Sequence, residues 1–258
     1  MRRLVLLAGA ACALVVLAGG SAGAAGWWKP PLGSTLQVQF DGDVDQTVQA
    51  SVYDLDAFDT DAATVSSLHG LGRHVVCYVD AGTWEKWRPD AGLYPKEVKG
   101  KTNGWPGERW LDVRRLDVLG PILNARLDLC AAKGFDAVEF DNVDGYANRT
   151  GFDLTGADQL TFDRRLADAA HSRGLGVGLK NDLDQVSQLL PSFDFSIDEQ
   201  CAQYKECDAL SPFVAAGKPV FEIEYKLKTS RFCAQAAALG FAAMRKHLSL
   251  NAWRDPCP

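Results

Sequence analysis

Short apolar runs recur along the chain, and most begin soon after a glycine and end in polar residues. The sequence of helix end, glycine, apolar run and polar terminus occurs at Gly70, Gly134, Gly174, Gly217 and Gly240. A glycine after a helical segment is the usual C-terminal cap, and a short apolar run bounded by turn residues is typical of a buried strand. With three further runs, the pattern predicts eight strands. They cover residues 36–40, 52–55, 75–79, 137–140, 177–179, 193–197, 220–223 and 247–250.

Helical segments alternate with these strands. We predict a helix over 62–69 with Asp61 as its N-cap, a helix ending at Lys133, and a helix over 156–172. Alternation of strands and helices indicates βαβ units and a parallel sheet. Eight strands in this length predict an α/β fold consisting of a single (β/α)8 TIM barrel. A doubly wound open sheet is the alternative, and it is disfavoured because no glycine-rich phosphate loop follows the first strand.

One connection is much longer than the others. Residues 81–115 follow the third strand and hold five large aromatic residues among glycine, proline and charged positions. These are Trp84, Trp87, Tyr94, Trp105 and Trp110. A loop of this length in a compact domain is usually functional. Aromatic rings there can stack on sugar rings or form a small core that holds the loop together, and we expect both uses.

The N-terminus has the pattern of a secretory signal peptide. Basic Met1-Arg2-Arg3 precedes an apolar run over residues 4–17, and Ala22-x-Ala24 offers a cleavage site. The run is too short to be a convincing membrane anchor. We therefore predict a cleaved signal over residues 1–25 and one catalytic domain over 26–258. The protein is expected to be secreted and to have no membrane association after cleavage.

The charge of the mature chain narrows the choice of partners. Loss of Arg2 and Arg3 with the signal leaves 25 basic residues against 33 acidic ones, a net charge near −8. This balance disfavours nucleic acid and anionic membranes, and it favours a neutral or cationic partner.

Six of the seven cysteines remain once Cys12 leaves with the signal. An even number in an exported chain predicts disulfides, although six cysteines allow fifteen pairings. Cys201 and Cys207 bracket a short loop and are predicted to pair. Cys77–Cys130 and Cys233–Cys257 would complete the set. Zinc is a poor alternative because the sequence has no CxxC or HExxH spacing.

Polar residues gather where the predicted strands end, the edge of a parallel barrel at which ligands bind. They are Asp41, Asp54, Asp56, Asp80, Glu139, Asp141, Asn142, Lys180, Asn181, Asp182, Asp198, Glu199, Glu222, Glu224 and Asn251. No serine or cysteine in this set has a histidine partner, so a nucleophilic triad is not expected. Paired carboxylates suit glycoside hydrolysis, or else a divalent metal ion held by Asp141, Asp144 and Asp198.

Three motifs carry a resemblance to a known family. Asp80-Ala81-Gly82-Thr83, the segment Phe140-Asp141-Asn142-Val143-Asp144 and the segment Asp198-Glu199-Gln200-Cys201 resemble glycoside hydrolase family 114. The resemblance implies a (β/α)8 barrel and an endo-α-1,4-polygalactosaminidase. Its two catalytic carboxylates fall on Asp141 and Glu199. Asp80 stands where many relatives have a Gly-Glu type ending.

The resemblance, together with the strand-end pattern, gives each residue an expected role. Asp141 is expected to be the nucleophile of a retaining reaction, and Glu199 the acid/base with a raised pKa, although a swap with Asp198 stays open. Expected substrate contacts are Asp54, Asp80, Trp84, Asn142, Asp144, Tyr146, Lys180, Asn181, Asp198, Glu222 and Glu224. We expect a monomer without metal or cofactor acting on a cationic galactosamine glycan. The alternatives are a non-catalytic carbohydrate-binding barrel and another α-glycosidase, such as an α-galactosidase.

Overall fold

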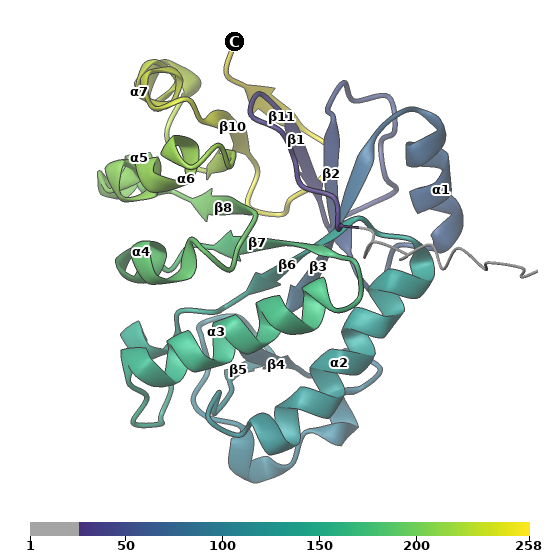
Figure 1. The fold of residues 1–258 in the computed structure, drawn as a ribbon, viewed down its shortest axis with the longest axis vertical. Coiled ribbons are helices and arrows are strands. Elements are labelled where there is room, and N and C mark those ends of the chain that lie inside the picture. The colour runs from purple at the N-terminus through teal and green to yellow at the C-terminus, as the bar shows by residue number, and fades with distance from the viewer. Residues whose placement is uncertain (1–25) are drawn as a thin grey trace, which may run out of the picture.

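A computed structural model describes residues 26–258, so the predicted signal peptide lies outside the described residues. The main sheet has the strand order β1-β2-β3-β6-β7-β8-β9-β10-β11 and curls into a nearly closed barrel (Figure 1). All neighbours from β1 to β10 are parallel, and only β11 runs antiparallel. The strands are β1 (Leu36–Gln39), β2 (Val52–Asp56), β3 (His74–Asp80), β6 (Ala137–Asp141), β7 (Gly176–Lys180), β8 (Phe195–Glu199), β9 (Val220–Glu224), β10 (Ala242–Lys246) and β11 (Arg254–Pro256). The predicted TIM-barrel class is confirmed.

Helices of unequal length surround the barrel. They are α1 (Ala62–Gly70), α2 (Leu116–Lys133), α3 (Gly156–His171), α4 (Val186–Leu189), α5 (Cys201–Tyr204), α6 (Ser211–Ala215) and α7 (Cys233–Leu239). Two of the predicted helix signals are confirmed, whereas Gly70, predicted to follow the end of the first helix, is the last residue of α1, and Leu71 is the C-cap. The side chain of Asp61 accepts the backbone N–H of Thr64 at the start of α1, and Gly134 ends α2 in the left-handed region at φ 87°. No helix within residues 26–258 is long and apolar enough to span a bilayer.

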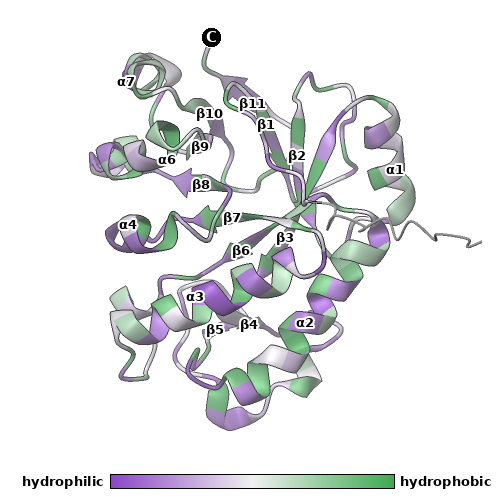
Figure 2. Cartoon of the chain, viewed as in Figure 1, coloured by the Kyte–Doolittle hydropathy of each residue, from purple (hydrophilic) through white to green (hydrophobic). Residues whose placement is uncertain are grey.

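The core has two parts. One fills the inside of the barrel, and the other lies between the strands and the surrounding helices. The inner part consists of Leu36, Val38, Val52, Val76, Ala137, Phe195, Ile197, Phe221, Ile223 and Met244. Polar residues take over toward the strand ends, as the hydrophilic colour at the tip of β8 shows (Figure 2). The barrel therefore has an apolar floor and a polar mouth.

The position of the eighth barrel strand was predicted wrongly. The expected strand over 247–250 is a turn region, and β10 instead covers Ala242–Lys246. Gly240 ends α7 at φ 74°, and the strand begins two residues later, the spacing that Gly174 and Gly176 also show. Asn251, expected at a strand end, lies in the connection to β11, where its backbone oxygen accepts the Nζ of Lys246.

This connection helps to close the barrel. The backbone N–H of Phe40 donates to the oxygen of Leu250 at 2.9 Å, and Gln37 Nε2 donates to the oxygen of Ala252 at 3.0 Å. The segment after β10 thus accepts hydrogen bonds from Gln37 on β1 and from Phe40 just beyond it. Without this segment, these donors would lie at an open edge of the sheet.

Three disulfides join Cys77 to Cys130, Cys201 to Cys207 and Cys233 to Cys257. These are the three pairs expected from the sequence. The first links β3 to α2 across 53 residues, and the second closes a loop of only 6 residues directly after β8. Loop-closure entropy gives the long link about 4 kcal/mol and the short one about 2 kcal/mol, so the short link mainly orders its own loop.

The long insert folds into a small lobe attached to the barrel. Its two strands, β4 (Thr83–Glu85) and β5 (Glu108–Trp110), form an antiparallel hairpin. Arg88 anchors the lobe, because its guanidinium pairs with Asp56 at 2.6 Å and with Glu85 at 2.7 Å in a buried setting.

The aromatic residues of the insert divide between core and surface, and sugar stacking by the exposed ones stays a prediction. Trp110 and Tyr94 are buried, whereas Trp87 and Trp105 are about half exposed. Trp84, expected to contact substrate, is partly buried, and its Nε1 donates to the oxygen of Ala91 within the insert.

Candidate active site

A buried lysine joins three carboxylates at the mouth of the barrel. The Nζ of Lys180, at the end of β7, lies 3.1 Å from Asp141 Oδ1, 3.4 Å from Glu139 Oε1 and 3.7 Å from Glu199 Oε1. Asp141 ends β6 and Glu199 ends β8, the two strands that flank β7. The contacts of 3.1 and 3.7 Å laid end to end bound the separation of the Asp141 and Glu199 oxygens at 6.8 Å.

Two tyrosines complete the cluster, and the sequence reasoning missed both. The hydroxyl of Tyr78 donates to Asp141 Oδ2 at 2.8 Å, and that of Tyr225 donates to Glu199 Oε1. A signal was available for each. Tyr78 lies two residues before Asp80 and so shares its face of β3, and Tyr225 lies two residues beyond Ile223, the neighbour of Glu199 in register.

The environment pushes the pKa values of the two carboxyls apart. Burial raises the pKa of Asp141, but the charge of Lys180 and the hydrogen bonds from Tyr78 and the Asn142 N–H outweigh it, so the pKa falls below its usual value. Burial raises the pKa of Glu199, and Lys180 only partly opposes this effect. A pair of carboxyls shifted in opposite directions is the arrangement in which one serves as a base or nucleophile and the other as an acid.

Residues in left-handed backbone conformation follow the three central strands. Asn142, Asn181 and Gln200 have φ of 60°, 49° and 72°. Such angles cost roughly 1–2 kcal/mol in residues other than glycine, and Asn tolerates them best. Two of these turn residues form hydrogen bonds that hold Asp141 and Glu199. The N–H of Asn142 donates to Asp141 Oδ1, and Asn181 Oδ1 accepts the N–H of Glu199 at 3.0 Å.

The Asp80-Ala81-Gly82-Thr83 motif supports the Asp141 turn. Asp80 accepts the Thr83 N–H at 2.9 Å and Asn142 Nδ2 at 3.1 Å. The N–H groups of Ala81 and Gly82 both donate to the oxygen of Asp141 at 3.1 Å. A Cβ on Gly82 would overlap the carbonyl of Asn142, so only glycine permits this approach. Asp80 therefore helps to hold the turn that follows Asp141.

An acidic pocket of about 320 Å³ opens beside Glu199. It is lined by six carboxylates: Asp144, Asp182, Asp184, Asp198, Glu199 and Glu206. Tyr146 lies in its wall, with its hydroxyl 3.1 Å from Asp182 Oδ1. Burial raises the pKa of Asp182 to about 8, and burial with the charges of Glu199 and Glu206 raises that of Asp198 to about 7. These acids repel one another in the absence of a cation.

Of the expected contact residues, four line this pocket, namely Asp144, Tyr146, Asn181 and Asp198, and seven do not: Asp54, Asp80, Trp84, Asn142, Lys180, Glu222 and Glu224. Asp54 is fully buried beside Glu139 inside the barrel, and burial, followed by the charge of Glu139, raises its pKa well above the usual range. Glu222 and Glu224 alternate with the inward Phe221 and Ile223 and so face the helical layer. Glu224 Oε1 accepts the N–H groups of two α5 residues, which makes its role structural.

The alternative of an oxygen-ligated metal site does not fit the geometry. Among residues 26–258, the oxygens of Asp141, Asp144 and Asp198 do not gather within 4.8 Å of one another. The one such cluster found there combines Glu222 with the sulfurs of Cys201 and Cys207, which are already joined in a disulfide.

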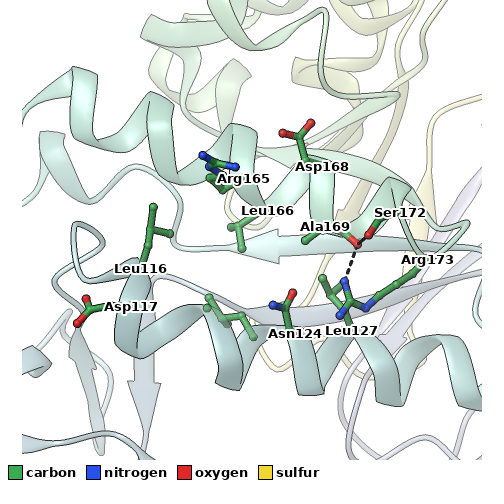
Figure 3. Close-up of a pocket in the computed structure, with 12 residues that line it drawn as sticks. Leu116, Asp117, Asn124, Leu127, Arg165, Leu166, Asp168, Ala169, Ser172 and Arg173 are labelled. Atoms are coloured by element: carbon green, nitrogen blue, oxygen red, sulfur yellow. Dashed lines mark hydrogen bonds between the residues drawn. The ribbon is translucent and has the colours of Figure 1, made fainter.

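A larger groove lies elsewhere on the protein. It has a volume of about 620 Å³ and runs between α2 and α3 on the outside of the barrel (Figure 3). Its walls come from these helices and the residues directly after α3, with Leu123, Leu127 and Leu166 in its base. No barrel strand contributes to its lining within the described part of the chain, so it is separate from the carboxylate cluster.

A (β/α)8 barrel with two carboxylates at its mouth whose pKa values are shifted in opposite directions is an arrangement typical of glycoside hydrolases. Residues 18–258 match the model of glycoside-hydrolase family GH114, and the chain belongs to this family. The fold resembles that of Aspergillus fumigatus Ega3 in complex with galactosamine, with a TM-score of 0.85 and 38% identity over 90% of this chain and 98% of that one. The glycoside hydrolase domain of PelA from Pseudomonas aeruginosa shares the fold, with a TM-score of 0.67 and 15% identity over 86% of this chain and 97% of that one. No curated protein matches the chain.

Proposed function

We propose that this family 114 glycoside hydrolase is a secreted endo-acting enzyme that cleaves α-1,4-galactosamine linkages with retention. The observation that carries the proposal is the Asp141–Glu199 pair held by Lys180. Retaining enzymes place their carboxyls about 5 Å apart and inverting enzymes roughly 6.5–9.5 Å apart, and the 6.8 Å bound, which applies to one oxygen of each carboxyl, is compatible with the shorter spacing.

The mechanism follows from the two environments. Asp141, kept ionised by Lys180 and Tyr78, attacks the anomeric carbon, and Glu199 in its protonated form donates a proton to the leaving oxygen. The bond from the anomeric carbon to that oxygen breaks as the bond to Asp141 forms. Glu199, now ionised, then takes a proton from water, which displaces Asp141 and releases the sugar with its original anomeric configuration.

The substrate class follows from charge. The acidic pocket next to Glu199 would attract an ammonium group, and a free galactosamine unit is cationic at neutral pH. The similarity to Ega3, which was solved with galactosamine, supports the same preference. We propose that Asp144, Asp182 and Asp198 contact this unit, and that fully N-acetylated glycan gains less from the pocket.

The test is hydrolysis of partially deacetylated galactosaminogalactan. Shortened chains whose new reducing ends are α-anomers by early-time NMR are the expected products. Binding without chain shortening at any pH would support the carbohydrate-binding alternative instead. Preferential cleavage of α-galactosides in a substrate panel would favour the α-galactosidase alternative, and β-anomers would refute the nucleophile role of Asp141.

The roles of the carboxyls are separable by single replacements. Asp141→Asn and Glu199→Gln should each lower turnover by orders of magnitude while binding survives. Asp198→Asn tests the reversed assignment, because no ion pair ties Asp198 to Lys180 in the described structure; as a substrate contact it should raise KM and leave most of the turnover. Near-normal activity in Glu199→Gln together with a large loss in Asp198→Asn would reverse the assignment.

We also propose export through the predicted signal peptide, action as a monomer and independence of metal ions. Three disulfides are typical of proteins that fold in an oxidising compartment. Chelator treatment should leave activity intact, and loss of activity that calcium or magnesium restores would contradict the metal-free scheme.

A further inference from the structure

The mouth of the barrel has a second pocket, with a charge opposite to the first. It has a volume of about 320 Å³ and is lined by Gln200, Tyr225, Lys226, Lys246, His247 and Leu248. Within the described residues, no carboxylate lines it. Gln200 also lines the acidic pocket, and Tyr225 donates to Glu199, so the two pockets meet at the catalytic acid. Both volumes fall at the lower end of the range for small-ligand sites, about 300–1,000 Å³.

The lysines make this second pocket unsuitable for an ammonium group. Lys226 is exposed at its rim. Lys246 is fully buried, and its Nζ donates to the oxygen of Asn251 at 2.7 Å. Burial, with the charge of Arg254, lowers the pKa of Lys246 to about 7. A cationic sugar placed here would meet the charge of Lys226 and would find no carboxylate in the lining to compensate.

An aromatic and apolar surface extends the second pocket outward. The rings of His247 and Trp253 stack at 4.1 Å with an interplanar angle of 8°. Trp253 is 39% exposed and Leu248 is 60% exposed. Exposed rings and an alkyl side chain of this kind suit the C–H face of a pyranose and the methyl of an acetamido group, neither of which needs a counter-charge.

We propose that the cleft is divided by charge, so that the acidic pocket takes a galactosamine unit and the basic pocket takes an uncharged unit of the same chain. The uncharged unit is N-acetylgalactosamine or galactose. Because Glu199 stands between the pockets, cleavage falls where a charged unit meets an uncharged one. This inference rests on the proposed function and adds a preference for glycans of mixed composition.

The test compares the chain ends made from four α-1,4-linked polymers. They are fully deacetylated, fully N-acetylated, half N-acetylated, and a mixed polymer of galactosamine and galactose. Hydrolysis in ¹⁸O water marks each new reducing end, and mass spectrometry then identifies the units on both sides of every cut. The wild-type enzyme should cut the mixed polymers fastest, with a charged unit on one side of the cut and an uncharged unit on the other. Comparison of the two mixed polymers shows whether the acetamido group or only the lack of charge is recognised.

Two variants test the basic pocket directly. Lys226→Glu should raise the share of galactosamine on that side of the cut by about two- to five-fold, the range of an exposed charge pair. Lys228→Glu is the matched control, because Lys228 is an exposed lysine of the same loop outside the pocket lining, and it should leave the share unchanged. Trp253→Ala should raise KM for the mixed polymers, with folding checked by thermal denaturation.

The outcomes separate this inference from the proposed function. Ends that match the bulk composition of the polymer, or equal effects of Lys226→Glu and Lys228→Glu, would overturn the divided cleft and leave the galactosaminidase activity standing. Failure to cleave any of the four polymers would refute the proposed function and the divided cleft together.

Discussion

Replacement of Lys180 is the most direct test of how the site sets its two protonation states. Lys180→Met keeps an unbranched stem of similar length but removes the ammonium that contacts Asp141, Glu139 and Glu199. Lys180 is nearly fully buried, so water replaces the lost charge poorly. The two catalytic carboxyls would then face each other without the cation that separates their titrations.

The magnitude follows from the burial of the cluster. Removal of one partner from a buried ion pair costs about 3–5 kcal/mol, because the remaining charge is left without compensation. If about 3 kcal/mol of this appears in the transition state for attack by Asp141, kcat/KM falls by about 150-fold. The shortest contact, at 3.1 Å to Asp141, implies that the nucleophile suffers most.

The assay is the pH dependence of kcat/KM. The proposed mechanism requires ionised Asp141 and protonated Glu199, so the profile should be bell-shaped, with limbs that belong to the coupled pair. Lys180 lowers the pKa of both groups, and its loss should move both limbs to higher pH. The limb positions do not depend on the fraction of folded protein. The lowered pKa of Asp141 also stabilises the fold above the ordinary carboxyl range, and this contribution is lost as the pH falls.

Lys133→Met is the matched control. Lys133 Nζ donates to three backbone oxygens, at 2.6 to 3.2 Å, on the outside of the barrel, and no carboxylate is among these acceptors. It should lower the melting temperature without moving either limb. Unshifted limbs in Lys180→Met, or kcat/KM within a few-fold of wild type, would refute the role assigned to the lysine.

Three further predictions concern the surroundings of the pair. Tyr225→Phe should move the alkaline limb of the pH profile to higher pH, because the Tyr225 hydroxyl lowers the pKa of Glu199 and the variant lacks it. An equal shift of the acid limb would contradict this assignment. Gly82→Ala should reduce kcat by at least about 10²-fold, because the new Cβ would displace Asn142 and a misplacement of about 1 Å can cost that much. Gly92→Ala is the control: Gly92 has open space around it, so its replacement should leave kcat unchanged. Binding of galactosamine near pH 7 should release protons, because a bound cation favours ionisation of Asp198 and Asp182, whose pKa values are about 7 and 8. Calorimetry in two buffers of different ionisation enthalpy measures this release, and equal binding enthalpies in the two buffers would contradict the prediction.

Most of the barrel could be predicted because its signals are local. The glycines that end α2 and α7, and the short apolar runs that form the strands, are set by neighbouring residues, and seven of the eight strands lie where the pattern placed them. The eighth was misplaced because the weakly apolar Ala242-Ala243-Met244 run was overlooked in favour of residues 247–250. The pairing of Cys201 with Cys207 was also readable, since only six residues separate them.

The face on which a strand-end residue lies was not readable in the same way. β9 is buried on both sides, so the alternation of Phe221 and Ile223 with Glu222 and Glu224 does not reveal which set points into the barrel. Glu222 and Glu224 were therefore expected at the mouth, but they face the helices, and Tyr225 takes the inward position.

The sequence by itself thus determined the strand–helix order, the cysteine pair of the short loop and the carboxylates at the ends of β6 and β8. The tertiary structure decided that Lys180 bridges those carboxylates and that tyrosines from β3 and the end of β9 bond to them. It also decided that an acidic pocket and a basic pocket meet at Glu199. The physical reason is range, since helix caps and strand periodicity act over a few residues, whereas these contacts join residues 19 to 63 positions apart, which the pairing of neighbouring strands in the sheet brings together.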